Sequence, residues 1–274
     1  MKNRSYYRLL TIAGSDCSGG AGIQADLKTF AAMGCYGMSV ITALTAQNTV
    51  AVEAVQVIPA DFVGKQLDAV LDDIGVDAVK TGMLCNAEII QIIAKRLKTN
   101  GITRIVVDPV MVSKSGVKLL SDEAVNSLKS NLLPLAALVT PNIPEAELLA
   151  GQPIKDRSTT EVAGKKIASF GAQAVLIKGG HSRENGSDDC LCITGNDGKT
   201  VTHWFEGDRI NTNNTHGTGC TLASAIAANL AKSLDIKEAV QASKKYLEEA
   251  LRKGSEYRLG KGTGPVHHFH SIWR

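Results

Sequence analysis

Short apolar runs alternate with longer amphipathic segments along the whole chain, and this alternation constrains the fold more than any other feature. The runs at 104–108, 137–140 and 174–178 are apolar throughout rather than at every second residue, which is typical of strands covered on both faces. Parallel strands need a crossover between them, usually a helix. The pattern therefore predicts an α/β protein in which helices cover both faces of a mostly parallel sheet.

The remaining elements follow from the same periodicities. Further strands are expected at residues 9–13, 38–46 and 54–58, and at 77–81. Helices are expected at residues 23–34, 62–74, 87–98, 122–133, 162–170, 218–232 and 236–253. The segment from Asp188 to Phe205 differs, because Asn196-Asp-Gly198 separates two strand-like runs and is typical of a β-hairpin turn. An antiparallel hairpin is therefore expected at one edge of the sheet.

Composition excludes several classes of protein. No repeat, low-complexity stretch or linker divides the 274 residues, so one domain spanning 1–274 is expected. The net charge of +3 and the lack of a basic run argue against a nucleic-acid partner. No apolar run reaches the ~18 residues of a membrane span, and the first residues do not resemble a signal peptide. The six cysteines contain no C-x-x-C pair. We therefore expect a cytoplasmic protein with reduced thiols and no membrane partner.

The most informative loop begins at Asn211 and runs directly into an apolar helix rich in small residues. The free amides of a helix's first turn and the helix dipole together favour an anion, and Gly217 and Gly219 let a phosphate approach the backbone. Cys220 lies in the same turn, where its thiolate would be stabilised, so we expect a thiol more acidic than that of a free cysteine. The alternative is an ordinary glycine-containing loop with a buried cysteine.

A second glycine-rich loop, Gly14 to Gly22, follows the first strand. It lacks the Lys-Ser/Thr pair of a phosphate loop and the spacing of the dinucleotide fingerprint. Asp16 and Asp26 flank it. The functional interpretation is a substrate-binding loop, whereas the alternative makes Asp16 a turn residue and Asp26 an exposed helix charge.

Polar side chains also follow three of the apolar strands. Asn142 and Glu145 would point from the carboxyl end of one strand towards a ligand crevice, and their oxygens suit a hydrated Mg²⁺. The alternative there is a Pro-started helix with a glutamate in its first turn. Asp108 and Lys178 stand at two other strand ends, where a lysine can meet a nucleotide phosphate. The histidines of 267–270 are interpreted as a polar cluster rather than a metal site.

Together these segments resemble the hydroxymethylpyrimidine/phosphomethylpyrimidine kinases of thiamin biosynthesis, in the vitamin-kinase branch of the ribokinase-like superfamily. The matching motifs are Thr11-Ile-Ala-Gly-Ser-Asp-x-Ser-Gly-Gly-Ala-Gly-Ile-Gln-Ala-Asp26, Val79-Lys-Thr-Gly-Met83, Val107-Asp-Pro-Val-Met111, Thr140-Pro-Asn-x-Pro-Glu-Ala146, Lys178-Gly-Gly-His181, Asn211-Thr-x-x-Thr-His-Gly-Thr-Gly-Cys-Thr221 and Gly264-Pro-Val-His-His-Phe269. The resemblance implies a ribokinase-like three-layer sandwich and a homodimer. It also implies ATP- and Mg²⁺-dependent phosphorylation of a small molecule, 4-amino-5-hydroxymethyl-2-methylpyrimidine, and then of its monophosphate to the diphosphate.

The resemblance further implies roles for individual residues. Gln47 would read the amino and ring nitrogens of the pyrimidine, since its amide offers both a donor and an acceptor. The same pocket would be lined by Gly14, Asp26, Met83 and Val110. ATP would be held by Asp108, Asn142, Lys178, Thr212 and Thr215, and the metal by Asp108 and Glu145. Charge on the transferring phosphoryl group would be stabilised by Gly217, Thr218, Gly219 and Cys220. Cys220 stands where most related sugar kinases have an aspartate base, and a thiol is a weak base for an alcohol.

Four alternatives stay open at this point. A pyridoxal kinase of the same branch, or a bifunctional enzyme, would act on a similar hydroxymethylated ring, although Gln47 and the His-Gly-Thr-Gly-Cys loop favour the pyrimidine. A non-catalytic ligand sensor is disfavoured because Asn142, Glu145, Lys178 and Cys220 are all present. An NAD-dependent dehydrogenase is disfavoured because the dinucleotide fingerprint is missing.

Overall fold

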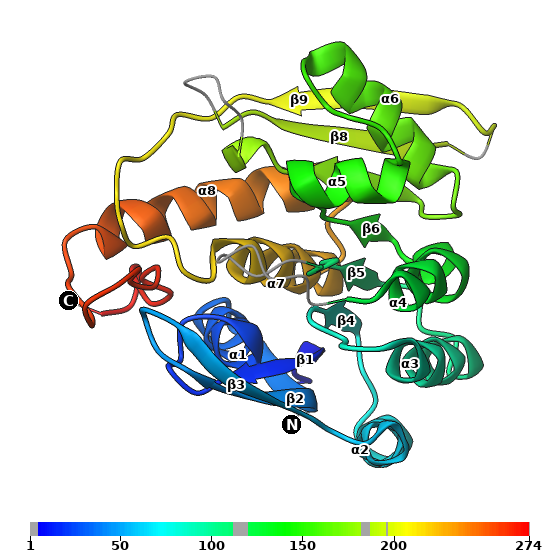
Figure 1. Cartoon of the computed structure of the whole chain (residues 1–274), viewed down its shortest axis with the longest axis horizontal. Helices are drawn as coiled ribbons and strands as arrows, with labels where there is room; N and C mark the ends of the chain where they lie inside the picture. Colours follow the sequence, from blue (N-terminus) through cyan, green and yellow to red (C-terminus); the bar gives the residue numbers. More distant parts are fainter. Residues whose placement is uncertain (1–4, 112–119, 182–186, 196, 274) are drawn as a thin grey trace.

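The computed structural model describes residues 5–111, 120–181, 187–195 and 197–273, and one sheet runs through this part of the chain (Figure 1). Its nine strands are ordered β3-β2-β1-β4-β5-β6-β7-β8-β9. The strands are β1 (Arg8–Asp16), β2 (Tyr36–Gln47), β3 (Val52–Val57), β4 (Ala78–Thr81), β5 (Ile105–Val107), β6 (Leu138–Val139), β7 (Ala174–Ile177), β8 (Asp189–Thr194) and β9 (Thr200–Phe205).

The middle of the sheet is parallel from β2 to β7, and both edges are antiparallel. The hairpin of β8 and β9 confirms the predicted edge; Asn196 of the predicted turn lies outside the described residues. The second antiparallel edge, β3 on β2, is an addition to the prediction. The loop between these strands is too short for a parallel crossover, and Asn48 closes it by accepting hydrogen bonds from the amides of Val50 and Ala51.

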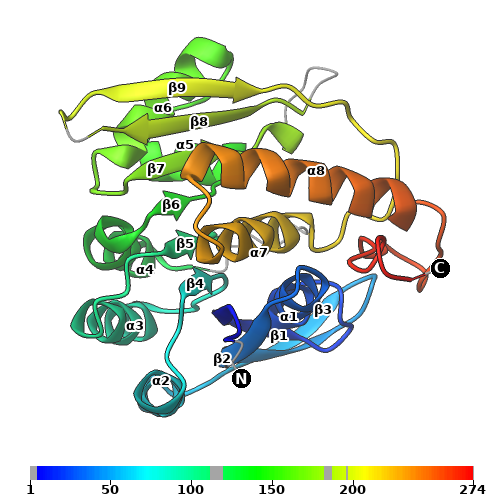
Figure 2. The ribbon, with the colours of Figure 1, turned by 180° about the vertical axis from the view of Figure 1, so that it is seen from behind.

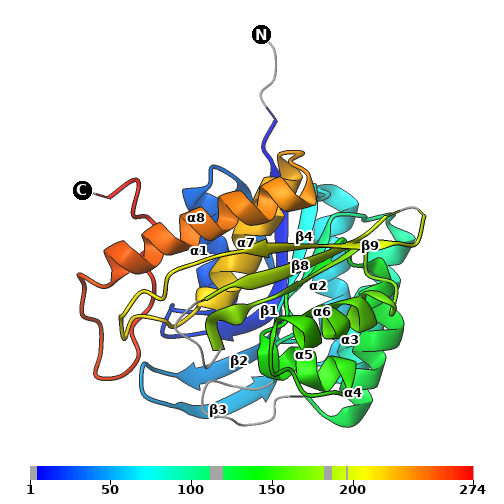
Figure 3. The same ribbon diagram turned by 90° about the horizontal axis from the view of Figure 1, so that it is seen from above.

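Helices cover both faces of the sheet, which confirms the predicted three layers (Figures 2 and 3). One face carries α1 (Gly22–Ala32), α7 (Thr218–Ala231) and α8 (Ile236–Gly254), and the other carries α2 (Ala60–Asp73), α3 (Ala87–Thr99), α4 (Asp122–Ser127), α5 (Ile143–Ala150) and α6 (Arg157–Ala168). Each face has its own apolar core, with Phe30 and Ile226 in the first and Leu67, Ile90 and Ile167 in the second. Strands β4 to β7, which lie between them, are buried on both sides.

Several elements differ from their predicted bounds, among them α6, which begins at Arg157 rather than at 162 because Asp156 caps it there. The helix expected at 122–133 leaves the α-helical form after Ser127 and continues as a π-helical turn and a short 3₁₀ turn. Pro134 lies in the last turn, where it has no amide hydrogen to continue the α-helical ladder. Strand β1 passes beyond Gly14, its predicted end, and reaches Asp16 after a shift of register between Ala13 and Ser15.

The parallel arrangement brings the ends of several strands to one edge of the sheet. Asp16 ends β1, Asp108 follows β5, Asn142 follows β6 and Lys178 follows β7. Since ligands of open α/β sheets bind outside the carboxyl ends of the strands, this edge is where a site is expected.

Candidate active site

A buried ion pair joins the ends of β5 and β7. The Nζ atom of Lys178 lies 2.8 Å from Oδ1 of Asp108, and the Thr140 hydroxyl donates to the same oxygen over 3.0 Å. Burial disfavours the charge on Lys178, but the carboxylates of Asp108 and Glu145 outweigh it and raise the pKa of the ammonium group. Burial likewise opposes the charge on Asp108, but Lys178 and Lys80 lower its pKa. The pair therefore stays ionised, with the ammonium group at the edge where a phosphate would bind.

The first turn of α7 faces this ion pair. Gly217 precedes the helix in the left-handed conformation, with φ of 77°, and no side chain caps the helix. The amides of Thr218 and Gly219 therefore remain free to bind an anion. A Cβ atom on Gly219 would lie 3.3 Å from Nζ of Lys178, so a larger residue would narrow the space between the amides and the ammonium group. The structure thus brings the predicted anion loop and the predicted phosphate-binding lysine together.

The expectation that Cys220 is an acidic thiol is wrong. Burial raises its pKa to about 11, although the nearby Lys80 and a hydrogen bond from the Gly22 amide act in the opposite direction. Desolvation of the thiolate is the largest of these effects, so the sulfur is protonated at neutral pH. The position of Cys220 in the first turn of a helix therefore does not make it a reactive cysteine.

The second glycine loop is organised around Asp16, which is almost fully buried. Its carboxylate accepts hydrogen bonds from the amide and hydroxyl of Ser18, from the amides of Gly20 and Ala21, and from His216. Burial opposes ionisation, but the hydrogen bonds from His216 and Ser18 outweigh it and lower the pKa of Asp16 well below its usual range. Asp16 is therefore a turn residue, as the alternative interpretation had it, and also a link to the anion loop.

Gln47 lies half-buried at the end of β2. Its Oε1 lies 3.2 Å from the Thr45 hydroxyl, which donates its one hydrogen to the Ser15 carbonyl over 2.9 Å. Its Nε2 atom lies 3.3 Å from Nε2 of His216. Gly14 and Met83, which are also expected in the substrate pocket, lie against each other at the neighbouring ends of β1 and β4. A Cβ atom on Gly14 would come within 2.5 Å of Cε of Met83. Gly14 and Met83 thus lie in contact, while Gln47 lies beside His216 of the anion loop.

Val110 follows Asp108 closely in the chain, and its amide donates to the Asp108 carbonyl over 2.9 Å, while its place in the substrate pocket stays a prediction. Thr212 and Thr215 belong to the segment that leads into α7. The Thr212 hydroxyl accepts a hydrogen bond from the Asn214 amide, and the Thr215 carbonyl accepts one from Thr218. These bonds shape the approach to the helix, and the ATP contacts of both threonines stay a prediction.

Asp26 does not line an open pocket, which corrects the sequence-based expectation. It is fully buried, and its two carboxylate oxygens accept from the hydroxyls of Thr11 and Ser224 and from the ammonium group of Lys80. A carboxylate has about four acceptor positions, and all of them are occupied here. Asp26 therefore belongs to an interior ion pair and has no acceptor left for a substrate.

Asn142 and Glu145 form a capping box at the start of α5. The Glu145 carboxylate accepts from the Asn142 amide over 2.8 Å, and the Asn142 side chain accepts from the Glu145 amide over 2.9 Å. This matches the alternative interpretation of a Pro-started helix. Burial also raises the pKa of Glu145 to about 7, with Lys178 opposing the rise and Asp108 adding to it. A cation bound here would relieve the crowding of the two carboxylates.

These oxygens fit a hydrated Mg²⁺ rather than an ion held by protein alone. Among the described residues, no group of three or more His, Cys, Asp and Glu side chains is placed to hold a metal ion. Mg²⁺ usually keeps several waters and takes one or two carboxylates together with substrate phosphates. Asp108 and Glu145 supply that number of carboxylates beside the anion loop.

Three residues of the site were missed by the sequence analysis: Lys80, His216 and Ser224. A lysine within the apolar run of β4 is itself a signal, because a fully buried ammonium group needs a partner. Ser224 follows Cys220 by one helical turn, so both lie on the same face of α7. His216 carries no such signal, since its partner Asp16 is 200 residues away in the sequence.

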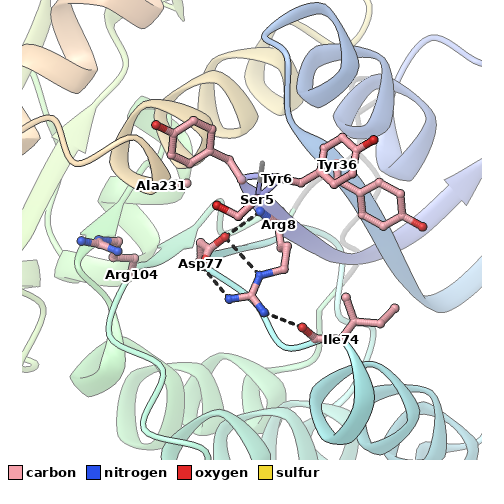
Figure 4. A pocket seen from close by; sticks show the side chains of 9 residues that line it. Ser5, Tyr6, Arg8, Tyr36, Ile74, Asp77, Arg104 and Ala231 are labelled. Carbon is pink, nitrogen blue, oxygen red and sulfur yellow. Dashed lines mark hydrogen bonds and ion pairs between the residues drawn. The ribbon is translucent and has the colours of Figure 1, made fainter. Parts of the chain in front are cut away.

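A cavity of about 750 Å³ lies at the opposite edge of the sheet, near the amino ends of β1, β4 and β5 (Figure 4). Arg8 there donates to both carboxylate oxygens of Asp77 and to the carbonyl of Ile74. Arg8 and Asp77 are thus engaged with each other, and none of the predicted site residues lines the cavity. We therefore assign the candidate site to the other edge.

Comparisons with known proteins agree with this assignment. The family model for phosphomethylpyrimidine kinase matches residues 16–267. A hydroxymethylpyrimidine/phosphomethylpyrimidine kinase from Rhizobium meliloti is 51% identical over 266 residues, covering 97% of this chain and 98% of that protein.

Two solved structures extend the comparison. Phosphomethylpyrimidine kinase from Clostridium difficile is 47% identical with a TM-score of 0.78, covering 89% of this chain and 99% of the other. An ADP complex of pyridoxal kinase from Bacillus subtilis is 39% identical with a TM-score of 0.89, covering 98% of this chain and 100% of the other. From its motifs, its fold and its relatives, the chain belongs to the phosphomethylpyrimidine kinase family.

Proposed function

We propose that the protein transfers the γ-phosphoryl group of ATP to the hydroxymethyl oxygen of 4-amino-5-hydroxymethyl-2-methylpyrimidine, and then a second phosphoryl group to the resulting monophosphate. The observation that carries this proposal is the free first turn of α7 facing the buried Lys178–Asp108 pair. Amides and an ammonium group aimed at one point suit a transferring phosphoryl group. The ADP complex of the related Bacillus subtilis kinase supports ATP as the donor.

Within this mechanism, Lys178 binds the phosphates of ATP, and the amides of Gly217 to Cys220 stabilise the charge of the transferring group. Mg²⁺, held through Asp108 and Glu145, supplies further neutralisation of phosphate charge. Gln47 orients the pyrimidine through its amide. Because the Cys220 thiol is protonated at neutral pH, we assign it a positioning part in the reaction, and the rate then depends on alignment more than on proton removal.

A pyridoxal kinase is the second candidate, because the pyridoxal kinase of Bacillus subtilis has the same fold along the full chain. The pyrimidine remains the preferred substrate in our proposal, since its amino and ring nitrogens match both ends of the Gln47 amide. Activity on both rings would make the enzyme bifunctional.

The test is direct detection of products. The purified protein is incubated with ATP, Mg²⁺ and the hydroxymethylpyrimidine, and the mixture is followed by mass spectrometry. We expect the monophosphate to form first and the diphosphate later, with neither product in the Lys178→Ala variant at the same ATP concentration. ATP consumption without a phosphorylated pyrimidine would refute the proposal.

We further propose that the chain acts as one domain, forms a homodimer and works in the cytoplasm. Strand β3 supports the dimer, because all six of its residues are exposed at a sheet edge and include Val52, Val55 and Val57. Uncovered edges of this kind favour association. No helix in the described part of the chain has the length and apolar character to cross a bilayer. Sedimentation equilibrium should give twice the 29.0 kDa mass of the chain, and a single-chain mass would contradict the dimer.

A further inference from the structure

The two glycine-bearing loops of the site are held together by one hydrogen bond between side chains. Nε2 of His216, at the entrance to α7, lies 2.8 Å from Oδ2 of Asp16, at the end of β1. Both side chains are largely buried, with 13% and 4% of their surfaces exposed. A charge-assisted hydrogen bond of this kind is stronger than a neutral one and is little weakened by solvent where the groups are shielded.

The backbones of the two loops also interlock. A Cβ atom on Gly20 would come within 2.3 Å of Cδ2 of His216, and one on Gly217 would come within 1.9 Å of the Gly20 carbonyl oxygen. Glycine is therefore required on both sides of the contact. Because the histidine ring fills the space above Gly20, neither loop can move alone without breaking the contact.

The hydrogen bond between His216 and Asp16 also determines which hydrogen bonds the Gln47 side chain can form. The Asp16 carboxylate only accepts, so Nε2 of His216 must carry the hydrogen. That nitrogen cannot then accept a hydrogen bond from the Gln47 amide, 3.3 Å away. Oε1 of Gln47 lies 3.2 Å from the Thr45 hydroxyl, but that hydroxyl has one hydrogen and donates it to the Ser15 carbonyl over the shorter distance of 2.9 Å. Among the contacts of the described residues, both ends of the Gln47 amide are therefore left available to a ligand.

The segment that follows α8 (Figure 1) makes backbone hydrogen bonds with His216 and with the turn after Gln47. The His216 amide donates to the Gly264 carbonyl over 2.9 Å, and the Thr263 amide donates to the Thr49 carbonyl, two residues after Gln47. One segment thus restrains the histidine and the turn that follows Gln47. The restraint limits how far the ring of His216 can shift relative to the Gln47 amide.

We propose that Asp16 and His216 form a positioning pair that couples the loop that binds the pyrimidine to the turn that stabilises the phosphoryl group. Neither side chain reacts. The pair holds the Gly217–Cys220 amides and the Gln47 amide at a fixed separation, so that the substrate hydroxyl meets the γ-phosphate in line. This inference rests on the proposed function, because it assigns the two loops to the two reactants of that reaction.

The test is a double-mutant cycle with Asp16→Asn, His216→Phe and the double variant. His203→Phe, on β9, is the matched control for loss of a histidine. For each protein, kcat, the KM values for pyrimidine and ATP, and the melting temperature are measured. We expect each single variant to lower kcat about 10-fold or more, because small misplacements of reacting groups are costly. The double variant should lower kcat no further than the worse single variant, while the KM for ATP stays within about twofold, since Lys178 is untouched.

The proposal is overturned if the kcat losses of the two single variants multiply in the double variant. It is also overturned if the variants change only KM. His216→Gln keeps a donor that reaches Asp16 but lacks the ring, so it should recover a measurable part of the kcat lost in His216→Phe. If Asp16→Asn fails to fold, the test is the comparison of kcat between His216→Gln and His216→Phe. Equal kcat values for these two variants would overturn the proposal. A wild-type enzyme that does not phosphorylate the pyrimidine would instead refute the proposed function.

Discussion

The Nζ atom of Lys80 lies 2.8 Å from Oδ2 of Asp26 in the interior, where both side chains are fully excluded from solvent. Thr11 and Ser224 donate to the same carboxylate. Burial opposes the charge on Lys80, but the Asp26 carboxylate outweighs it and raises the pKa of the ammonium group. Since Ser224 follows Cys220 by one turn of α7, this ion pair ties β4 and α1 to the helix that carries the anion loop.

Removing one member of this pair should be strongly destabilising. Lys80→Met leaves the Asp26 carboxylate buried without its counter-ion, and we expect the free energy of unfolding to fall by about 3–5 kcal/mol. The double variant Lys80→Met/Asp26→Leu should lose less than the single variant, because no charge remains to be desolvated. Urea denaturation measures both. As a control, Lys65→Met breaks an exposed pair with Asp61 and should cost about 0.5 kcal/mol or less. A loss of that size for Lys80→Met would contradict the account.

Much of the fold could be predicted from the sequence, because the alternation of strands and helices and the layers it implies follow from patterns that act locally. The apolar runs of β5, β6 and β7 and the hairpin of β8 and β9 are of this kind. The change from α-helical to π-helical and 3₁₀ turns after Ser127 was not predicted, because it depends on tertiary packing, in which Leu132 and Leu133 are buried just before Pro134. The motifs correctly placed Lys178, Asp108 and the anion loop at one edge.

Side-chain environment was the part that the sequence could not supply. Asp26 and Cys220 have the right residue types for a ligand site, but their behaviour depends on what is packed around them. The first is saturated by Lys80, Thr11 and Ser224, and the second is desolvated. Both effects arise from contacts between segments far apart in the chain, which spacing along the sequence does not reveal.

Cys220 should react slowly with alkylating agents at neutral pH. Its pKa of about 11 leaves very little thiolate, and the thiolate is the reactive form. Cys17 is exposed, so iodoacetamide should label Cys17 well before Cys220 at pH 8. Labelling of Cys220 should increase about tenfold for each pH unit up to its pKa, and bound ATP and substrate should shield it further. Peptide mass spectrometry gives both rates, with Cys17→Ser as the control. Preferential labelling of Cys220 at pH 8 would contradict the assignment.

Gln47→Ala should lower activity on the pyrimidine more than activity on pyridoxal. Loss of the amide leaves the pyrimidine's polar edge unpaired in the site, which costs about 1–3 kcal/mol in kcat/KM. Pyridoxal presents a different edge and should lose less, so the ratio of the two activities should fall. Gln56→Ala, on the exposed strand β3, is the matched control and should leave the ratio unchanged. Equal losses on both substrates would make Gln47 a structural residue.

His268 should make stability depend on pH. Burial lowers its pKa to about 3, and the neutral ring is hydrogen-bonded with Thr221 over 3.1 Å. Between the unfolded-state pKa near ~6.5 and that value, the unfolded chain binds a proton that the folded chain excludes, so stability falls as the pH falls. The loss approaches about 1.4 kcal/mol per pH unit. His268→Asn should remove this part of the slope between pH 6 and pH 5 in urea titrations; an unchanged slope would show that the folded protein accepts the proton.

The most direct test of the account compares three acceptors in one coupled assay: the hydroxymethylpyrimidine, its monophosphate and pyridoxal, each with saturating ATP and Mg²⁺. The account predicts turnover of both pyrimidines, with kcat/KM for the hydroxymethylpyrimidine at least about 10-fold above that for pyridoxal, equivalent to about 1.4 kcal/mol of transition-state stabilisation through Gln47. A preference for pyridoxal, or no ATP-dependent phosphorylation of either pyrimidine, would contradict it.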